Sequence, residues 1–312
     1  MRSFIAAIGY CVGHTHAIET LFNSPQVHDV TPQFFRERGL QNFCAQSEST
    51  LSMCRAAIDT ALRDSGTDPR HVGTVVVDAD YWHCSEEDIT QILESLHLAG
   101  IPRVPILGLG LQTCSGSMTA LDLADRLLRT DPQSRPILIL VCGRAAPGAS
   151  RIDTLRSTIL SDGVAACVMT SKPRGYQLLA STCYTTLDTV RTNVVGDKPV
   201  NSLLNSYGNI GSLSRILYDT AGIQGRQIEA LFCTNGSLMY TRIAADAAGV
   251  RPDRVVNDNI PKFAHMFSCD QLIGLATYAE AGRFRPGAPY LLLAWSPYVF
   301  SGALLTYIGH DR

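Results

Sequence analysis

The chain has 312 residues, of which 17% are charged and 46% belong to the hydrophobic set, and its formal net charge is −2. This length is enough for one large domain or two ordinary ones with a sizeable core, and the low charged fraction is typical of an extensively buried α/β protein. A net charge near zero excludes a general electrostatic attraction to nucleic acid or to acidic membranes.

The strongest local patterns alternate between strands and helices along the whole chain. In the first half, strands are expected over residues 3–9, 72–77, 104–109, 136–142 and 163–170, with helices over 47–65, 85–98 and 115–128. In the second half, strands are expected over 176–181, 230–234, 255–256, 290–294 and 302–307, with helices from residue 207 and over 238–248 and 268–282. A polar stretch over 185–206 is expected to connect the halves. This order predicts stacked α/β layers with mixed sheets.

The ten cysteines give no sign of a metal site or a disulfide framework. They form no Cys-x-x-Cys pair and no zinc-ligand spacing, and several lie in apolar runs. In a reducing compartment such cysteines are mostly small buried hydrophobic residues. The apolar run at the N-terminus is too short for a signal peptide, and no stretch reaches the length of a membrane span. We therefore expect a cytoplasmic protein without a metal and without a membrane partner.

One cysteine, Cys114, lies in the context of a nucleophile. It follows the predicted strand and a glycine-containing turn, and a helix begins directly after it. The amide groups and dipole of a helix N-terminus stabilise a thiolate, which is the species that attacks a thioester. The small residues Ser115, Gly116 and Ser117 are expected to leave room for a substrate beside the sulfur. The simpler interpretation is a core cysteine, but the strand–turn–helix context favours a nucleophile. A dinucleotide loop is excluded because the third glycine position is Thr113 and no acidic ribose partner follows.

Three segments resemble those of the ketoacyl-ACP synthase III enzymes of the thiolase superfamily. Residues 113–116, Thr-Cys-Ser-Gly, followed by Ala120-Leu121, resemble the active-site segment. Residues 153–166 resemble the arginine-containing approach to the Gly-Asp-Gly-Ala strand, and residues 281–294 resemble the Pro-Gly segment and strand near the C-terminus. The resemblance implies a five-layer αβαβα thiolase-like fold of two similar halves, usually in a homodimer. Residues 1–170 would form the half with the nucleophile, and residues 171–312 the half with its partners.

The partners of the cysteine depart from the family pattern. Ketoacyl-ACP synthase III enzymes use a His and then an Asn, but here Asn235 or, in an alternative register, Ser237 stands where the His is expected. His265 stands close to the expected Asn. This order resembles the Cys/Asn/His arrangement of thiolases. His265 could act as a general base or bind a thioester carbonyl, and Asn235 could donate to an oxyanion or hold water. The simpler alternatives are a helix-capping His and an Asn-Gly turn.

The loop over residues 293–298 is where the family places a glycine-rich loop, and where a true thiolase has a second cysteine. This chain has neither there, although Ser296 retains a backbone N–H that Pro297 lacks. We therefore expect the N–H groups of Cys114 and Ser296 to hold the oxyanion. Cys269 lies near His265 in sequence, but its place in a predicted helix favours a core position.

The resemblance also implies an acyl group carried on coenzyme A or on an acyl carrier protein, with no permanently bound cofactor. Arg156 matches the arginine that packs on the adenine and phosphates of coenzyme A, and Arg242 matches a basic residue at the carrier-docking face. Phe34 is the nearest residue to a position that carries an indole in the family. The alternative for both arginines is a solvated surface charge. A weakened coenzyme A site would favour a carrier-protein donor.

These observations predict an acyltransferase that forms an acyl-enzyme on Cys114 and passes the acyl group to a hydroxyl, an amine or a carbanion. The missing synthase histidine argues against routine initiation of fatty-acid synthesis and for a specialised biosynthetic pathway. Two alternatives stay open. One is a Claisen condensation that forms a carbon–carbon bond. The other is an inactive thiolase-fold subunit that stabilises a catalytic partner.

Overall fold

In the computed structural model, residues 2–23, 30–79, 85–131, 133–153, 155–187 and 199–309 are described, with only the backbone for 199–204. Nine strands of this described part form one continuous sheet. In spatial order they are β5 (Ile106–Leu109), β4 (Thr74–Ala79), β6 (Ile137–Gly143), β7 (Gly163–Thr170), β1 (Phe4–Val12), β8 (Gly175–Thr185), β11 (Val299–Gly309), β10 (Pro289–Trp295) and β9 (Ala230–Cys233). The first five strands belong to the first half of the chain and the last four to the second. The two sets join where Phe4 and Ile5 of β1 pair with Gln177 and Tyr176 of β8.

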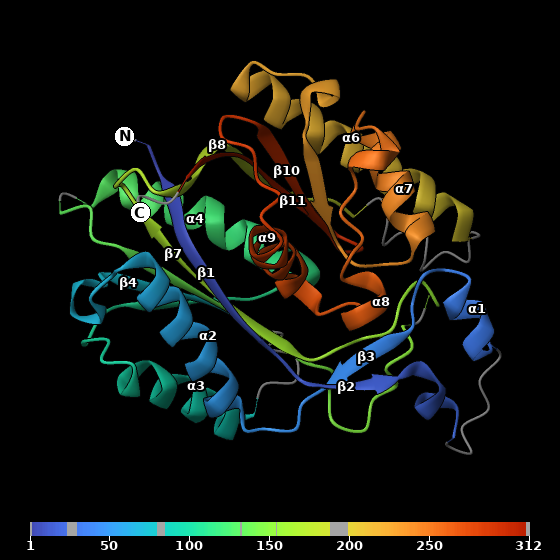
Figure 1. The fold of residues 1–312 in the computed structure, drawn as a ribbon, viewed down its shortest axis with the longest axis horizontal. Helices are drawn as coiled ribbons and strands as arrows, with labels where there is room; N and C mark the ends of the chain where they lie inside the picture. The colour runs from blue at the N-terminus through green and yellow to red at the C-terminus, as the bar shows by residue number, and fades with distance from the viewer. Residues whose placement is uncertain are drawn as a thin grey trace.

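Within the described ranges, six long helices pack on the strands in three layers. They are α2 (Thr50–Ser65), α3 (Glu86–Leu98), α4 (Gly116–Thr130), α6 (Pro199–Ala221), α7 (Leu238–Ala247) and α9 (Asp270–Glu280). One apolar cluster joins α2 and α3 to the first-half strands, and another joins α6 and α7 to the second-half strands. A third cluster surrounds α4 and α9 between the two sets of strands. Figure 1 shows this order, with α4 and α9 in the middle and the other helix pairs on opposite sides.

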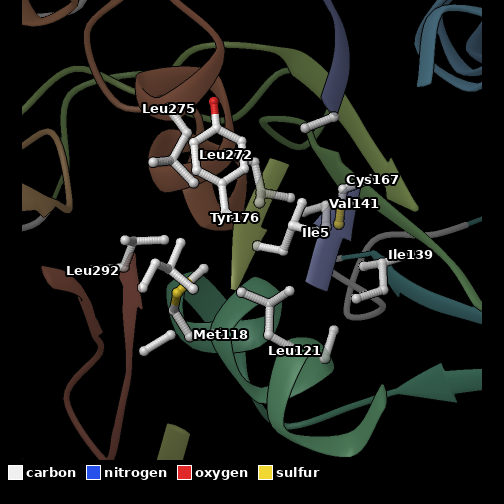
Figure 2. Packing of buried hydrophobic residues seen from close by; sticks show 14 of the residues in the cluster. Ile5, Met118, Leu121, Ile139, Val141, Cys167, Tyr176, Leu272, Leu275 and Leu292 are labelled. Atoms are coloured by element: carbon white, nitrogen blue, oxygen red, sulfur yellow. The ribbon is translucent and has the colours of Figure 1, made fainter. Parts of the chain in front are cut away.

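The central cluster explains why α4 and α9 bury most of their apolar residues. Met118 and Leu121 of α4 and Leu272 and Leu275 of α9 are all fully buried, and Figure 2 shows them converging with strand residues such as Leu292. A helix between two layers of strands contacts apolar side chains on both sides, so residues 270–276 of α9 are all buried. Arg126 and Arg129 keep part of the C-terminal half of α4 exposed. The five-layer αβαβα fold that the resemblance implied is therefore confirmed.

Shorter elements lie at the end of the molecule where the first-half and second-half loops meet. They are β2 (His14–Ala17), β3 (Asn42–Ala45), α1 (Pro32–Arg36) and α8 (Ile260–Phe263). A fourth apolar cluster, which includes Phe35, Phe43 and Ile260, holds α1, β3 and α8 together. These elements were not anticipated from the sequence.

Most expected elements are present with small changes at their ends. The expected strand at residues 255–256 is not a strand, because Val255 makes only an isolated bridge to Leu231. The expected helix from residue 268 begins at Asp270, after a 3-10 turn over Phe267–Cys269. The helix expected from residue 207 begins at Pro199, and most of the connection before it lies outside the described residues. Within the described ranges, no helix combines the length and the apolar character needed to cross a membrane.

Candidate active site

Cys114 lies in a strained turn between β5 and α4. Leu111 and Thr113 have φ values of 63° and 47°, a left-handed conformation that is uncommon for residues other than glycine. Such conformations persist where the surrounding structure holds them, and they concentrate at functional sites. Ser115 supplies part of that support: its hydroxyl donates to Val299 O at 3.1 Å, and its carbonyl accepts from Ser301 Oγ at 2.9 Å. The second-half sheet therefore fixes the nucleophile turn of the first half.

His265 lies in a second strained turn, between α8 and α9. The residues Ala264 and Phe267 on either side of it both have a φ of 52°. The backbone of His265 is held by the segment before β7, since its N–H donates to Ile159 O at 3.0 Å and its carbonyl accepts from Ser161 N at 2.8 Å. Two separate strained turns thus present the two side chains to each other.

The side chains of Cys114, His265 and Asp270 form a hydrogen-bonded triad. The Sγ atom of Cys114 lies 3.1 Å from Nε2 of His265, and Nδ1 of His265 lies 2.5 Å from Oδ2 of Asp270. The side chain of His265 is 5% exposed and that of Asp270 is fully buried, while Cys114 is half-buried. A nucleophile, a base and a group that orients the base are the three parts of a catalytic triad. The sequence had indicated two of them, and Asp270 was missed.

Four donors surround the carboxylate of Asp270. Oδ1 accepts from Met266 N at 2.8 Å and from Asn235 Nδ2 at 3.2 Å, and Oδ2 accepts from Asn235 N at 2.8 Å and from His265 Nδ1. Because an ionised carboxylate is only an acceptor, Nδ1 of His265 must carry a hydrogen. The lone pair of a neutral His265 therefore lies on Nε2, the nitrogen that faces Cys114.

The environment of His265 favours its protonated form. Burial alone would lower its pKa, but the negative charge of Asp270, with a further contribution from Cys114, raises the pKa well above its ordinary value. These charges favour the imidazolium form of His265 over the neutral form. Since the folded-state pKa is raised, this protonation contributes stability that is fully present below the ordinary pKa and is lost as the pH rises through the raised one.

The other buried cysteines have surroundings that oppose ionisation. Burial raises the pKa of Cys167 to about 12, and it also raises the pKa of Cys233 and Cys269. For Cys142, a hydrogen bond with Cys54 and burial raise the pKa well above its ordinary value. These residues match the expectation of small core cysteines, whereas the Sγ atom of Cys114 lies 3.1 Å from Nε2 of the His265 imidazole.

Asn235 contacts the triad, but not as the sequence suggested. Its side chain and its own N–H both donate to Asp270, and its carbonyl accepts from Thr158 Oγ1 at 2.9 Å. The side-chain amide of Asn235 therefore binds Asp270, and the contact of Asn235 with the sulfur runs only through Asp270 and His265. Its observed contacts are those of a residue that orients the carboxylate.

Two expectations about the space around the sulfur need correction. The N–H of Ser296 donates to Val299 O at 2.8 Å within the turn between β10 and β11, so this N–H is not directed at a substrate carbonyl. Gly116 does not open space for a substrate, because the carboxylate of Asp78 fills the volume that a side chain would take there. The N–H of Cys114 stays a predicted oxyanion donor.

Two of the three residues expected to bind the carrier, Phe34 and Arg242, lie on adjoining helices. Phe34 is half-buried in α1, and Arg242 is exposed on α7. The carbonyl of Arg38, just after α1, accepts from Leu238 N at the start of α7 at 2.9 Å, so the two helices adjoin. The Arg38 guanidinium lies 3.5 Å from the centre of the Phe34 ring and covers one face of it. Arg156 is exposed in the loop before β7. Their role in binding a carrier stays a prediction.

The described part of the chain contains no cluster of His, Cys, Asp and Glu that could hold a metal ion. The triad can perform covalent capture of an electrophilic carbonyl by sulfur, with a proton carried by an oriented imidazole.

Comparison with known proteins agrees with the fold. Residues 111–186 match the family described as 3-oxoacyl-[acyl-carrier-protein (ACP)] synthase III, and residues 218–307 match the C-terminal family of the same enzymes. Together the two matches cover more than half of the chain. Comparison with the curated proteins gives no match.

Several solved structures share the fold. One described as the acyltransferase ChlB3 has a TM-score of 0.85 at 18% identity, with 99% of each chain covered. The 3-oxoacyl-[acyl-carrier-protein] synthase III of Aquifex aeolicus has a TM-score of 0.80 at 16% identity, covering 98% of this chain and 100% of that one. A tetronic acid condensing enzyme, AbyA1, has a TM-score of 0.76 at 16% identity, covering 97% and 99%.

Fold and family matches together define a thiolase-fold enzyme of the transferase type, which transfers or condenses acyl groups. Within that class, the chain belongs to the ketoacyl-ACP synthase III family.

Proposed function

We propose that this protein is an acyltransferase that accepts an acyl group on Cys114 from a thioester and passes it to a hydroxyl or amine acceptor. The observation that carries this proposal is the contact chain from Cys114 through His265 to Asp270. The donor is an acyl group on coenzyme A or on an acyl carrier protein, and the setting is a specialised biosynthetic pathway. Arg156, Arg242 and Phe34 are proposed to bind the carrier.

In the first step, the proton of the Cys114 thiol resides on Nε2 of His265, which leaves a thiolate beside an imidazolium. The thiolate attacks the thioester carbonyl carbon, and the bond from that carbon to the carrier sulfur breaks. The carrier leaves as a thiol after it takes the proton from Nε2. His265 is then neutral, with its remaining hydrogen on Nδ1 and directed at Asp270.

In the second step, the neutral Nε2 takes a proton from the acceptor hydroxyl or amine as the acceptor attacks the acyl carbon. The bond between that carbon and the Cys114 sulfur then breaks, and the thiolate–imidazolium pair is restored. Asp270 stays ionised throughout and stabilises the imidazolium, which is the role of the carboxylate in a triad.

The same contacts favour a heteroatom acceptor over a Claisen condensation. A condensation requires hydrogen-bond donors directed at the enolate oxygen of the second thioester. The side-chain amide of Asn235 is instead bound to Asp270, and Asp270 orients His265 so that the neutral imidazole presents a lone pair. A base next to the nucleophile is what removal of a hydroxyl or amine proton needs.

The test is intact-protein mass spectrometry after incubation with acyl-CoA thioesters and, separately, with acyl-carrier-protein thioesters. We expect a mass increase equal to one acyl group, absent in Cys114→Ala, and its loss when a hydroxyl or amine acceptor is added. The arm that acylates identifies the carrier. Release of carbon dioxide from a malonyl thioester in step with product would support the condensation instead. No increase with any donor, together with acylation on adding a homologous subunit, would support the non-catalytic alternative.

We also propose a homodimer that forms through strand β5. Among the described residues, β5 is an end strand of the sheet, so one side of its backbone has no strand partner there. Ile106 on this strand and Leu111 just after it are 43% and 64% exposed. An open apolar edge favours pairing with a second chain. We expect Ile106→Lys to convert a dimer to a monomer in size-exclusion chromatography with light scattering. A wild-type monomer, or an unchanged dimer in the variant, would argue against this interface.

A further inference from the structure

A second buried carboxylate, that of Asp78, lies between the two strained turns of the active site. Asp78 is near the end of β4 and is 3% exposed. It is paired in register with Leu109 of β5, the strand that leads to Cys114. It has no place in the proposed proton transfers, because the two ring nitrogens of His265 contact Cys114 and Asp270.

On the side of the nucleophile, Asp78 packs against the first residue of α4. A Cβ atom at Gly116 would lie 2.0 to 2.2 Å from the three atoms of the Asp78 carboxyl group, closer than real Cβ atoms approach anything. Glycine is therefore required at position 116 so that the carboxylate can contact the helix backbone. Cys114 is two residues before this contact, so a shift of Asp78 would displace the turn that holds the sulfur.

On the side of the base, Asp78 binds the turn of His265. The hydroxyl of Ser268 donates a short hydrogen bond to Oδ2 of Asp78, and both residues are buried. Ser268 is three residues after His265 and directly follows Phe267, whose φ is 52°. A turn with two left-handed non-glycine residues holds its shape only while its surroundings fix it. The bond from Ser268 is one such restraint, and it reaches the strand next to the nucleophile.

We propose that Asp78 is a positioning residue that joins the two turns and holds His265 Nε2 within reach of Cys114 Sγ. The inference rests on the proposed function, since the contact it maintains is the one that prepares the thiolate. A displacement of about 1 Å in a catalytic contact can cost on the order of 10²-fold in rate. A link between the turns through one buried carboxylate therefore has a direct effect on reactivity, in addition to any effect on stability.

The test uses Ser268→Ala, which removes the hydroxyl and leaves the carboxylate of Asp78 in place. The rate of alkylation of Cys114 by iodoacetamide is measured from pH 5 to 10 by peptide mass spectrometry, since the thiolate is the species that reacts. We expect a midpoint about one pH unit higher, a reaction about tenfold slower at pH values below the wild-type midpoint, and rates that converge at pH 10. Ser95→Ala is the matched control, because Ser95 is equally buried but bonds only to Ile92 O within α3.

Asp78→Asn and the double variant test whether the two residues act as a unit. We expect Asp78→Asn to shift the profile in the same direction, and the double variant to be no slower than the slower single variant. If the Ser268→Ala profile coincides with the wild type and only the melting temperature falls, Asp78 and Ser268 have a structural role alone. That outcome would overturn the inference. Additive effects in the double variant would do the same. Alkylation needs no acyl donor, so failure of acylation would refute the proposed function without deciding this inference.

Discussion

Asp270→Asn should slow the acylation of Cys114 by about 10² to 10⁴-fold, the range that general acid–base catalysis contributes. An asparagine at this position can direct either its oxygen or its NH₂ group at Nδ1. Its oxygen is a weaker acceptor than a carboxylate. Its NH₂ group would force the hydrogen of a neutral imidazole onto Nε2. His265 would then lack a lone pair toward the thiol. The substitution also removes the charge of Asp270, the leading contribution that raises the pKa of His265, so the imidazolium would be lost at a lower pH.

The measurement is the single-turnover rate of acyl-mass gain, from pH 6 to 9, with a thioester that acylates the wild type. Asp125→Asn is the matched control: Asp125 is also a largely buried aspartate, it lies on α4, and its ion pair is with Arg129 on the helix surface. We expect the control to retain the wild-type rate. A folded Asp270→Asn variant with an unchanged rate would remove Asp270 from the mechanism and leave a Cys–His pair.

The sequence was informative about Cys114 because its signal is local. A strand, a turn with glycines and a helix occur in order within about twenty residues, and the thiolate-stabilising property of a helix N-terminus follows from that order alone. His265 was found through its place in a family pattern. The helix α2 was found because its apolar residues occur near helical spacing.

Asp270 was missed because its role depends on contacts that are distant in sequence. Aspartate is common at the start of a helix because its charge interacts favourably with the helix dipole. Its presence at position 270 therefore did not by itself indicate a catalytic role. What distinguishes it is the convergence of Asn235, from the end of β9, and of the His265 turn on its carboxylate. The five-residue spacing from His265 to Asp270 at a helix start is the signal that could have suggested the pair.

The errors around the site have the same origin. Asn235 and Ser296 were assigned donors for an oxyanion on the basis of sequence position, but the direction of an N–H depends on the turn that contains it. In the structure, the Asn235 amide is bound to Asp270 and the Ser296 N–H is bound to Val299 O. Gly116 was expected to leave room for the substrate, but the group that requires a glycine there is the carboxylate of Asp78 on β4.

Asn235→Asp should destabilise the protein at pH 8 by about 3 kcal/mol or more, the scale of an uncompensated buried charge. The replaced group lies 3.2 Å from Oδ1 of Asp270, and both residues are almost fully buried. Two carboxylates at that distance cannot both ionise cheaply, so the pKa of one of them must be strongly raised. The folded variant then binds a proton that the unfolded chain releases.

The sign of the pH dependence follows from that proton. A carboxyl group whose pKa is raised on folding favours the folded state below the ordinary pKa, and this contribution is lost as the pH rises through the raised value. The difference in melting temperature between wild type and Asn235→Asp should therefore be large at pH 8 and should shrink toward pH 5. Taking the difference removes the contribution of His265 that both proteins share.

Asn235→Ala separates charge from the loss of a hydrogen bond. It removes the amide that donates to Asp270 but keeps the backbone N–H, which donates to the same carboxylate at 2.8 Å. We expect a smaller loss, about 1 to 3 kcal/mol, with little dependence on pH. Thermal unfolding followed by circular dichroism at pH 5, 6.5 and 8 compares the three proteins. A deficit for Asn235→Asp that is the same at every pH, or no larger than that of Asn235→Ala, would mean that Asn235 and Asp270 do not face each other in the folded protein. The orientation of the triad by Asn235 would then have to be abandoned.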